Sequence, residues 1–307
     1  MPIAAQLIGQ TRSQADAHSK QIRNAKNERT IMLRSAKKFK SFTLRARDGD
    51  IGKANEFYFD DENWMVRYLV ANTGGWLTYR LVLISPYVLS PANEAEQVLP
   101  VDLTKKQMEE SPSLNSDQPV SRQYETQYYS YYGWPNYWSG PKSWGESGYP
   151  GHQRGGVNWP CGMAIPPLGS SMPHGKNAAA NSASVHREVV GDPHLRSTEH
   201  VTGHHIQALD GEIGHVEDFI IDDETWAIRY LVIDTKKWRP GKHILISPQW
   251  VERVSWGELK VFVNLSREII KDSPEYTAKS LVTRDYEIEL HKHYHRGRYW
   301  ADELVAS

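Results

Sequence analysis

Two stretches of fourteen residues, FYFDDENWMVRYLV at Phe57–Val70 and FIIDDETWAIRYLV at Phe219–Val232, decide the fold of this chain. Each stretch has two runs of β-branched and aromatic residues on either side of an acidic four-residue turn, which predicts a β-hairpin. Because successive strand side chains point to opposite faces, Trp64 and Trp226 are expected on the apolar face beside the turn. The sequence therefore predicts one hairpin in each half of the chain, with a tryptophan in its core.

The second face of each hairpin combines charged and apolar side chains. A register that closes the turn places Glu56 opposite Arg67, and the second copy repeats this as Asp218 opposite Arg229. A face of this mixed character is typical of a contact surface, either between the two copies or toward a partner. The candidate interface residues are Met65, Arg67, Leu69, Ala227, Arg229 and Leu231.

The similarity between the two halves extends well beyond the hairpins. At a constant offset of 162 residues and without a gap, 19 of the 39 positions from Asp48 to Pro86 are identical to those of the second copy. A repeat of this extent indicates a duplicated domain. The residues that we expect to form turns and core in both copies are Asp48, Gly49, Trp64, Asp210, Gly211 and Trp226.

Each copy is predicted to contain several short strands and one short helix. The Asp-Gly pairs favour tight hairpin turns, and a capping-box pattern at Thr104 and Gln107 indicates the start of a helix. Short strands separated by turns at this spacing are typical of a small barrel or sandwich. Further strands are expected at residues 81–84, 97–103, 243–246 and 259–265.

The shared pattern, DGxIGxVxDFxxDDxxWxxRYLVxxT followed by a strand ending in LISP, resembles the PRC-barrel family, named for the cytoplasmic domain of the photosynthetic reaction centre H subunit. The resemblance covers Phe42–Trp138 and Val201–Trp300, and departs from the pattern at Ala54-Asn55 and in the aromatic tails. It implies an all-β fold with short helices, built as two tandem pseudo-symmetric PRC-barrel-like small β-barrels. Members of such a family need not share an active site.

Composition divides the chain into four parts: a basic N-terminal arm at residues 1–40, a first domain with an aromatic tail at 41–138, a Gly/Pro/Ser-rich linker at 139–200, and a second domain with a C-terminal tail at 201–307. Through Arg47 the chain has eleven Lys and Arg residues against two acidic ones. Such an arm is either a solvated tail or a contact for anionic membranes or nucleic acid. We expect two separate barrels joined by an accessible connection.

Patterns that carry chemistry are scarce. His291, His293 and His295 would share one face of a strand and could bind a metal there, and the acidic turns Asp60–Glu62 and Asp222–Glu224 could contact Ca²⁺. The first copy has no histidines at the corresponding positions, and three acids lack the oxygen count of a dedicated calcium loop. We predict neither a metal site nor a bound cofactor.

Catalytic residues are not predicted either. The sequence has no nucleophile elbow, phosphate-binding glycine loop or dinucleotide-binding pattern, and the one cysteine, Cys161, lies in the linker without an evident base. No apolar run approaches the ~20 residues that span a bilayer, and no secretory signal begins the chain. The expected location is the cytoplasm, including the periphery of the inner membrane.

The resemblance implies a non-enzymatic docking or assembly scaffold with protein partners. One candidate role is an H-subunit-like component at the cytoplasmic face of a membrane-bound photosynthetic complex. An alternative is an RNA- or ribosome-associated assembly factor, although nucleic acid is not the expected partner, and an unrecognised enzyme is a weaker alternative. The barrels are expected to pack against each other or against those of a second chain.

Overall fold

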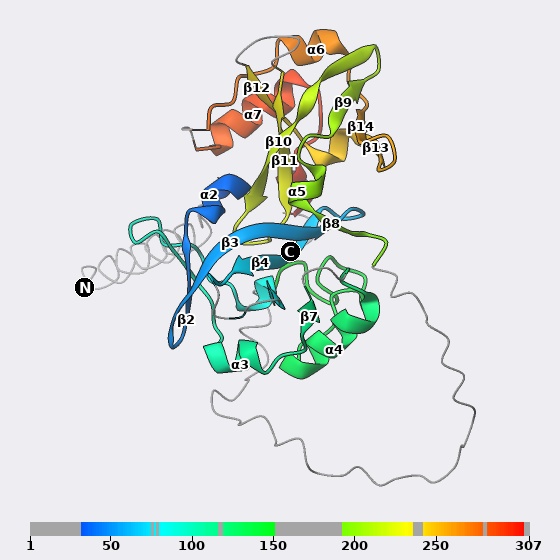
Figure 1. Cartoon of the computed structure of the whole chain (residues 1–307). Coiled ribbons are helices and arrows are strands. Elements are labelled where there is room, and N and C mark those ends of the chain that lie inside the picture. The colour runs from blue at the N-terminus through cyan, green and yellow to red at the C-terminus, as the bar shows by residue number, and fades with distance from the viewer. Residues whose placement is uncertain are drawn as a thin grey trace, which may run out of the picture. The chain divides into compact units, whose positions relative to one another are not determined.

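The computed structural model describes residues 32–74, 77, 80–115, 119–150, 192–235, 242–278 and 281–303. Residues 1–31 of the basic arm, most of the linker and Cys161 lie outside this part of the chain. The described residues form two mixed β-sheets with short helices (Figure 1), which confirms the predicted fold class of two tandem β units. The strand order is open in both sheets, so neither closes into a barrel through strand pairing among the described residues.

The first sheet is centred on the predicted hairpin and has short helices at its margins. Its strands follow one another in the order β6 (Val98–Pro100), β2 (Thr43–Ala46), β3 (Gly49–Asp60), β4 (Met65–Asn72), β5 (Arg80–Ile84) and β7 (Leu114–Asn115). The helical elements of this half are η1 (Pro86–Val88), α3 (Lys105–Glu109) and α4 (Arg122–Tyr132).

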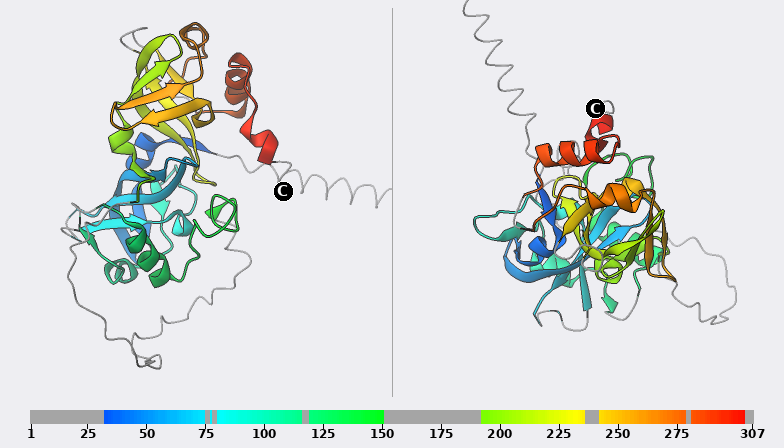
Figure 2. Two further views of the ribbon diagram at one scale, coloured as in Figure 1. Left: turned by 90° about the vertical axis from the view of Figure 1, so that its right-hand side faces the viewer. Right: turned by 90° about the horizontal axis from the view of Figure 1, so that it is seen from above.

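The second sheet repeats this arrangement, because β10 and β11 correspond to β3 and β4. Its order is β12 (His243–Ile246), β11 (Ile228–Asp234), β10 (Gly211–Asp222), β9 (His205–Ala208), β14 (Lys260–Val263) and β13 (Val251–Ser255). Figure 2 shows α7 beside this sheet. The helical elements of this half are η3 (Pro248–Trp250), α6 (Arg267–Lys271), α7 (Arg284–His293) and α8 (Tyr299–Glu303).

The repeated Asp-Gly pairs form the turns before β3 and β10 and also cap a helix. The glycines of Asp48-Gly49 and Asp210-Gly211 have positive φ angles of 130° and 144°, which L side chains rarely adopt. The two aspartate side chains accept hydrogen bonds from the backbone N–H groups of Lys105 at 2.9 Å and Arg267 at 2.7 Å. Each turn is thereby tied to the first residue of α3 or α6.

The predicted hairpin register is wrong. In the structure Phe59 pairs with Val66 and Glu56 pairs with Val70, so Glu56 does not lie opposite Arg67. The pair next to the turn is Asp60 with Met65, so the loop is longer than the predicted register allows, and extra residues at Asn55 of β3 and at Arg67 of β4 change the register again along the strands. A β-bulge of this kind adds a residue on one strand, and alternation alone cannot reveal it. β10 has shifts at the corresponding places.

The two halves exchange their N-terminal segments. Strand β1 (Leu33–Ser35), followed by α2 (Ala36–Lys40), precedes the first sheet in the chain but pairs antiparallel with β10 of the second sheet. Strand β8 (Leu195–Ser197), followed by α5 (Thr198–Val201), leads into the second sheet but pairs antiparallel with β3 of the first. Each half therefore contributes a strand and a helix to the sheet of the other half.

The exchange follows the internal repeat. Both exchanged strands have the sequence Leu-Arg-Ser at an offset of 162 residues. Leu33 lies opposite Asp222, and Leu195 lies opposite Asp60, so the register of the two pairings is the same. The described residues from Leu33 onward accordingly form one compact unit.

Parts of the expected arm and linker thus belong to the folded sheets. β1 and α2 fall within residues 1–40, and β8 falls within residues 139–200. The first part of that segment, residues 139–150, also contributes Trp144, whose side chain is fully buried. The domain boundaries at residues 41 and 201 remain predictions, and the exchange adds contacts across both of them.

Because of the exchange, the two halves of the chain should bind each other when they are produced as separate polypeptides. We expect residues 32–150 and 192–307, produced as separate chains and mixed, to form a one-to-one complex, because each supplies an edge strand and a helix to the other. Gel filtration with light scattering measures the mass. A first chain shortened to residues 41–150 lacks β1 and α2 and should bind its partner more weakly. Two independent folded monomers would contradict the exchange.

Candidate functional site

The two hairpins meet at their turns through backbone hydrogen bonds. The N–H of Val66 donates to the carbonyl oxygen of Trp226 at 2.8 Å, and the N–H of Ile228 donates to that of Trp64 at 2.8 Å. Val66 and Ile228 are equivalent residues of the repeat, as are the two tryptophans. In a two-fold symmetric dimer, each residue of the interface makes the same contact from both subunits. The two hairpins make such reciprocal contacts within a single chain.

Aromatic side chains of both halves pack together around this junction. Phe39 of the exchanged α2 lies with its ring centroid 5.5 Å from that of Trp226 and 5.6 Å from that of Phe57. The rings of Phe59 and Phe219 lie 6.0 Å apart, and all five side chains are buried. The two sheets therefore share one apolar core at the junction.

The second aspartate of each acidic turn holds the arginine of an exchanged strand. Asp61 accepts a hydrogen bond from Arg196 Nε of β8 at 2.8 Å, and Asp223 accepts one from Arg34 Nε of β1 at 3.0 Å. A carboxylate paired in this way with a guanidinium is not a free oxygen ligand. The acidic turns, considered above for Ca²⁺, instead fasten the two halves together.

The first aspartate of the first turn pairs with Arg67. Nη2 of Arg67 lies 2.6 Å from Oδ2 of Asp60, and the Arg67 side chain is only 2% exposed. Its guanidinium also lies 3.9 Å from the ring centroid of Tyr137 and donates to the carbonyl oxygen of Ser143 at 2.5 Å. The arginine is thus fully enclosed by an acid, an aromatic ring and a backbone carbonyl.

Arg229 has the corresponding partners in the second half. It lies 2.9 Å from Asp222 and 4.0 Å from the ring centroid of Tyr299. The predicted pairing of Arg229 with Asp218 is therefore wrong, as is that of Arg67 with Glu56. Glu56 instead accepts a hydrogen bond from Ser197 of the exchanged β8.

A buried glutamate binds the aromatic tail that both repeats share. Glu125 of α4 accepts hydrogen bonds from the hydroxyl groups of Tyr68 at 2.8 Å and Tyr137 at 2.9 Å, and Nη1 of Arg122 lies 3.0 Å away. Burial raises the pKa of the Glu125 carboxyl to about 7, although Arg122 opposes this shift. The aromatic tail therefore packs onto its own sheet through a polar network.

The second half repeats the network around Glu287 of α7. Its carboxylate accepts hydrogen bonds from Tyr230 at 2.9 Å and Tyr299 at 2.7 Å, and burial raises its pKa. Duplication of a complete hydrogen-bonded network indicates that it serves the fold.

The candidate interface residues lie almost entirely inside the protein. Met65 and Ala227 form an isolated antiparallel bridge between the two halves, and both are buried. Leu69 and Leu231 have no exposed surface, and the Arg229 side chain is 12% exposed. Of this set the structure brings Met65 and Ala227 directly together across the junction.

The three alternating histidines do not converge. His291 and His293 belong to α7 and His295 follows it, so the strand geometry considered for them is wrong. Nδ1 of His291 lies 2.6 Å from the carbonyl oxygen of Gly297, and Nε2 of His293 lies 2.6 Å from that of Ile269. In a helix, residues two apart point in different directions.

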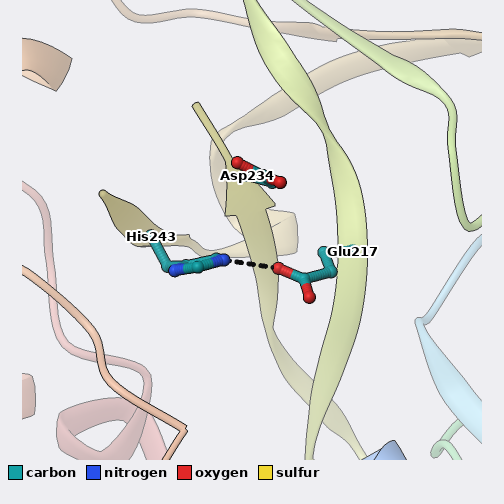
Figure 3. A group of neighbouring side chains, drawn as sticks. All are labelled: Glu217, Asp234 and His243. Carbon is teal, nitrogen blue, oxygen red and sulfur yellow. Dashed lines mark ion pairs between the residues drawn. The ribbon is translucent and has the colours of Figure 1, made fainter. Parts of the chain in front are cut away.

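Sequence patterns missed a different group of potential metal ligands, Glu217, Asp234 and His243. They come from the adjacent strands β10, β11 and β12, and their ligand atoms lie within 4.8 Å of one another. Figure 3 shows His243 directed toward Glu217, with Nε2 and Oε2 2.7 Å apart. The three residues have no periodic spacing, but a comparison of the repeats offered a signal, because their equivalents Asn55, Asn72 and Leu81 all differ from them in type.

A cleft of about 910 Å³ opens at the hairpin junction. Both halves line it, the first through Met65 and Arg67 and the second through Ala227 and Arg229. A neighbouring cleft of about 500 Å³ shares several of these residues. Exposed residues on the larger cleft are Glu62, Asn63, Pro141, Lys142, Glu146 and His194.

The duplicated sheets, their reciprocal exchange and their internal polar networks define a tandem β module. Residues 208–269 match the family model of the PRC-barrel domain, so the second half of the chain carries a PRC-barrel domain. The first half is related to it through the internal repeat. A search of curated proteins found no match.

The match at residues 208–269 supports a scaffold or assembly-type role for this part of the chain. Among the described residues no helix is long and apolar enough to cross a membrane.

Proposed function

We propose that this chain is a non-enzymatic assembly module that docks a protein partner in the cleft of about 910 Å³ at the hairpin junction. The observation that carries the proposal is that both halves line this cleft. A partner bound there lies over the junction of the two repeats, so recognition depends on the folded pair.

The walls of the cleft have the chemistry of a protein interface. Trp138 is half-buried, and the guanidinium of Arg122 lies 4.4 Å from its ring centroid. Aromatic and arginine side chains are enriched where proteins bind one another. The rim carries both signs of charge, with Glu62 and Glu146 opposed by Lys142. A mixed rim favours a polar protein surface over a purely anionic partner.

Three buried titratable groups, Glu125, Glu287 and His291, have structural partners. Glu125 and Glu287 each bind two tyrosine hydroxyl groups, and His291 lies within hydrogen-bonding distance of Tyr230 and the Gly297 carbonyl. These pairings occupy three groups that general acid–base chemistry could otherwise use. They support a scaffold rather than an enzyme.

The partner class follows from the family resemblance. The specific role that we propose is an H-subunit-like component at the cytoplasmic face of a membrane-bound photosynthetic complex. The alternative role as an RNA-associated assembly factor depends on the basic arm, most of which lies outside the described residues.

Site-specific photocrosslinking in the native cell tests the docking surface. A photoreactive amino acid at Asn63 or at Lys142, both exposed on the cleft, should crosslink to the same protein partner. The matched control is Glu258, which is exposed but belongs to the β13–β14 turn outside the cleft. Mass spectrometry identifies the product.

Crosslinks to one protein from both cleft positions and none from Glu258 would support the proposal. Equal products from all three positions would show that the cleft is not the docking surface. Crosslinks to RNA alone would favour the assembly-factor alternative.

A further inference from the structure

Three potential metal ligands meet on one side of the second sheet. Glu217 lies at an irregularity of β10, where the register with β11 shifts between Val216 and Asp218. Asp234 is the last residue of β11, and His243 is the first residue of β12. Bulges redirect side chains and are frequent next to functional sites. The strand order β10-β11-β12 thus brings residues from three segments to one place (Figure 3).

The donor set is suited to a zinc-class divalent cation. It provides one imidazole nitrogen and two carboxylates, and three protein ligands leave a coordination position for water. At metal–ligand distances of about 2.0–2.2 Å, ligand atoms around a tetrahedral ion lie roughly 3.5 Å apart. The ligand atoms of Glu217, Asp234 and His243 lie within 4.8 Å of one another. Rotations of their side chains would therefore bring all three atoms around one ion. Glu217 and His243 have room for them, since about a third of each side chain is exposed.

Asp234 is the most buried of the three proposed ligands. It is only 3% exposed, whereas the other two side chains reach the surface. A rigid ligand with two adjustable neighbours lets the site close around an ion that enters from solvent.

The first half of the chain shows that the fold does not require these three side chains. Its equivalent residues are Asn55, Asn72 and Leu81, and β3, β4 and β5 form the same strand arrangement there. At these three positions, only the second copy has side chains that commonly bind zinc-class cations.

Lys37 pairs with Glu217 through the carboxylate oxygen that does not face His243. Its Nζ lies 2.9 Å from Oε1 of Glu217, whereas His243 faces Oε2. Lys37 therefore offsets part of the negative charge of the two carboxylates. Hydrogen bonds to the second oxygen of a ligating carboxylate typically orient it. Because Lys37 belongs to α2, the site also touches the exchanged segment of the first half.

We propose that Glu217, Asp234 and His243 bind one divalent cation of the zinc class, with water completing its coordination. Binding would join three strands of the second sheet and hold Glu217 in place for Lys37. This site is independent of the docking cleft, and neither proposal requires the other.

The test compares metal binding by untagged, chelator-treated full-length protein and by the triple variant Glu217→Asn, Asp234→Asn, His243→Leu. These substitutions install the residues of the first copy, which supports the same strands, so the variant should keep the wild-type circular dichroism. Equilibrium dialysis with Zn²⁺ should show one more bound ion per wild-type chain. With Co²⁺, the wild-type protein alone should develop the visible absorption of a low-coordinate site.

Single variants refine the test. Each of the three should weaken Zn²⁺ binding at least ~10-fold, on the scale seen when a metal site loses a supporting group. His205→Leu is the matched control, because His205 pairs with Glu212 at 2.9 Å in the same sheet and is not one of the three proposed ligands. Equal Zn²⁺ binding by wild type and triple variant, or an equal loss in His205→Leu, would overturn the proposal and leave Glu217 and His243 as an ion pair only.

Discussion

Replacing Trp226 with alanine should lower the free energy of unfolding by about 3–5 kcal/mol, the usual cost of removing a large buried aromatic side chain. Trp226 is 2% exposed, and its ring packs against Phe39 and Phe57 at centroid distances of 5.5 and 6.4 Å. Both phenylalanines belong to the first half of the chain. The substitution therefore opens a cavity where the two halves share their core. Urea denaturation followed by circular dichroism measures the loss.

Trp64→Ala is the matched control from the first repeat. The two tryptophans occupy the same turn position with φ angles of 56° and 62°, so the backbone contribution is nearly equal in both variants. Trp64 is 9% exposed and stacks on Phe59 of its own hairpin at 5.2 Å. We expect a smaller loss for Trp64→Ala. A loss below about 1 kcal/mol for Trp226→Ala would contradict the shared core.

The hairpins and the duplication could be predicted because their determinants are local. Alternation of apolar residues has the period of a strand, and an acidic turn between two such runs leaves few alternatives. Because the two halves share this pattern, the hairpin predicted for one half is also predicted for the other. The Asp48-Gly49 turn was predictable for the same reason, since its geometry depends on two adjacent residues.

The register and the exchange were not predictable from these patterns. A bulge changes which residues lie opposite each other without altering the composition of either strand. A strand of three residues, such as β1, carries no information about which sheet it joins. Since both sheets offer equivalent edges, pairing within a half and pairing across halves use the same residues. The repeated Leu-Arg-Ser was the available sequence signal.

The site was predictable only in part. Arg67 and Arg229 were predicted to pair with Glu56 and Asp218, but they pair with Asp60 and Asp222. The residues that enclose them, Tyr137 and Tyr299, come from tails about 70 residues later in the chain. Contacts over such separations have no periodic signature. The burial of the candidate interface residues follows from the same long-range packing.

Charge reversal of Arg67 should therefore destabilise the protein rather than act only on docking. Arg67→Glu removes the partner of a buried carboxylate and adds a second carboxylate beside Asp60. Breaking a buried ion pair costs about 3–5 kcal/mol because the remaining charge stays unpaired. The Arg67 side chain is 2% exposed, and Nη2 lies 2.6 Å from Asp60 Oδ2. We expect a loss at the upper end of this range, measured by urea denaturation.

Two comparisons identify the cause of that loss. The double variant Asp60→Asn, Arg67→Met removes both charges, while the introduced amide keeps an oxygen for the N–H of Asn63, which donates to Asp60 at 2.6 Å. It should recover much of the stability that Arg67→Glu loses, because no buried charge is left alone. Arg229→Glu should cost less than Arg67→Glu, since its side chain is 12% exposed and water can solvate the new carboxylate. If Arg67→Glu unfolds at the wild-type urea concentration, Arg67 is accessible to solvent and the enclosed ion pair does not stabilise the junction.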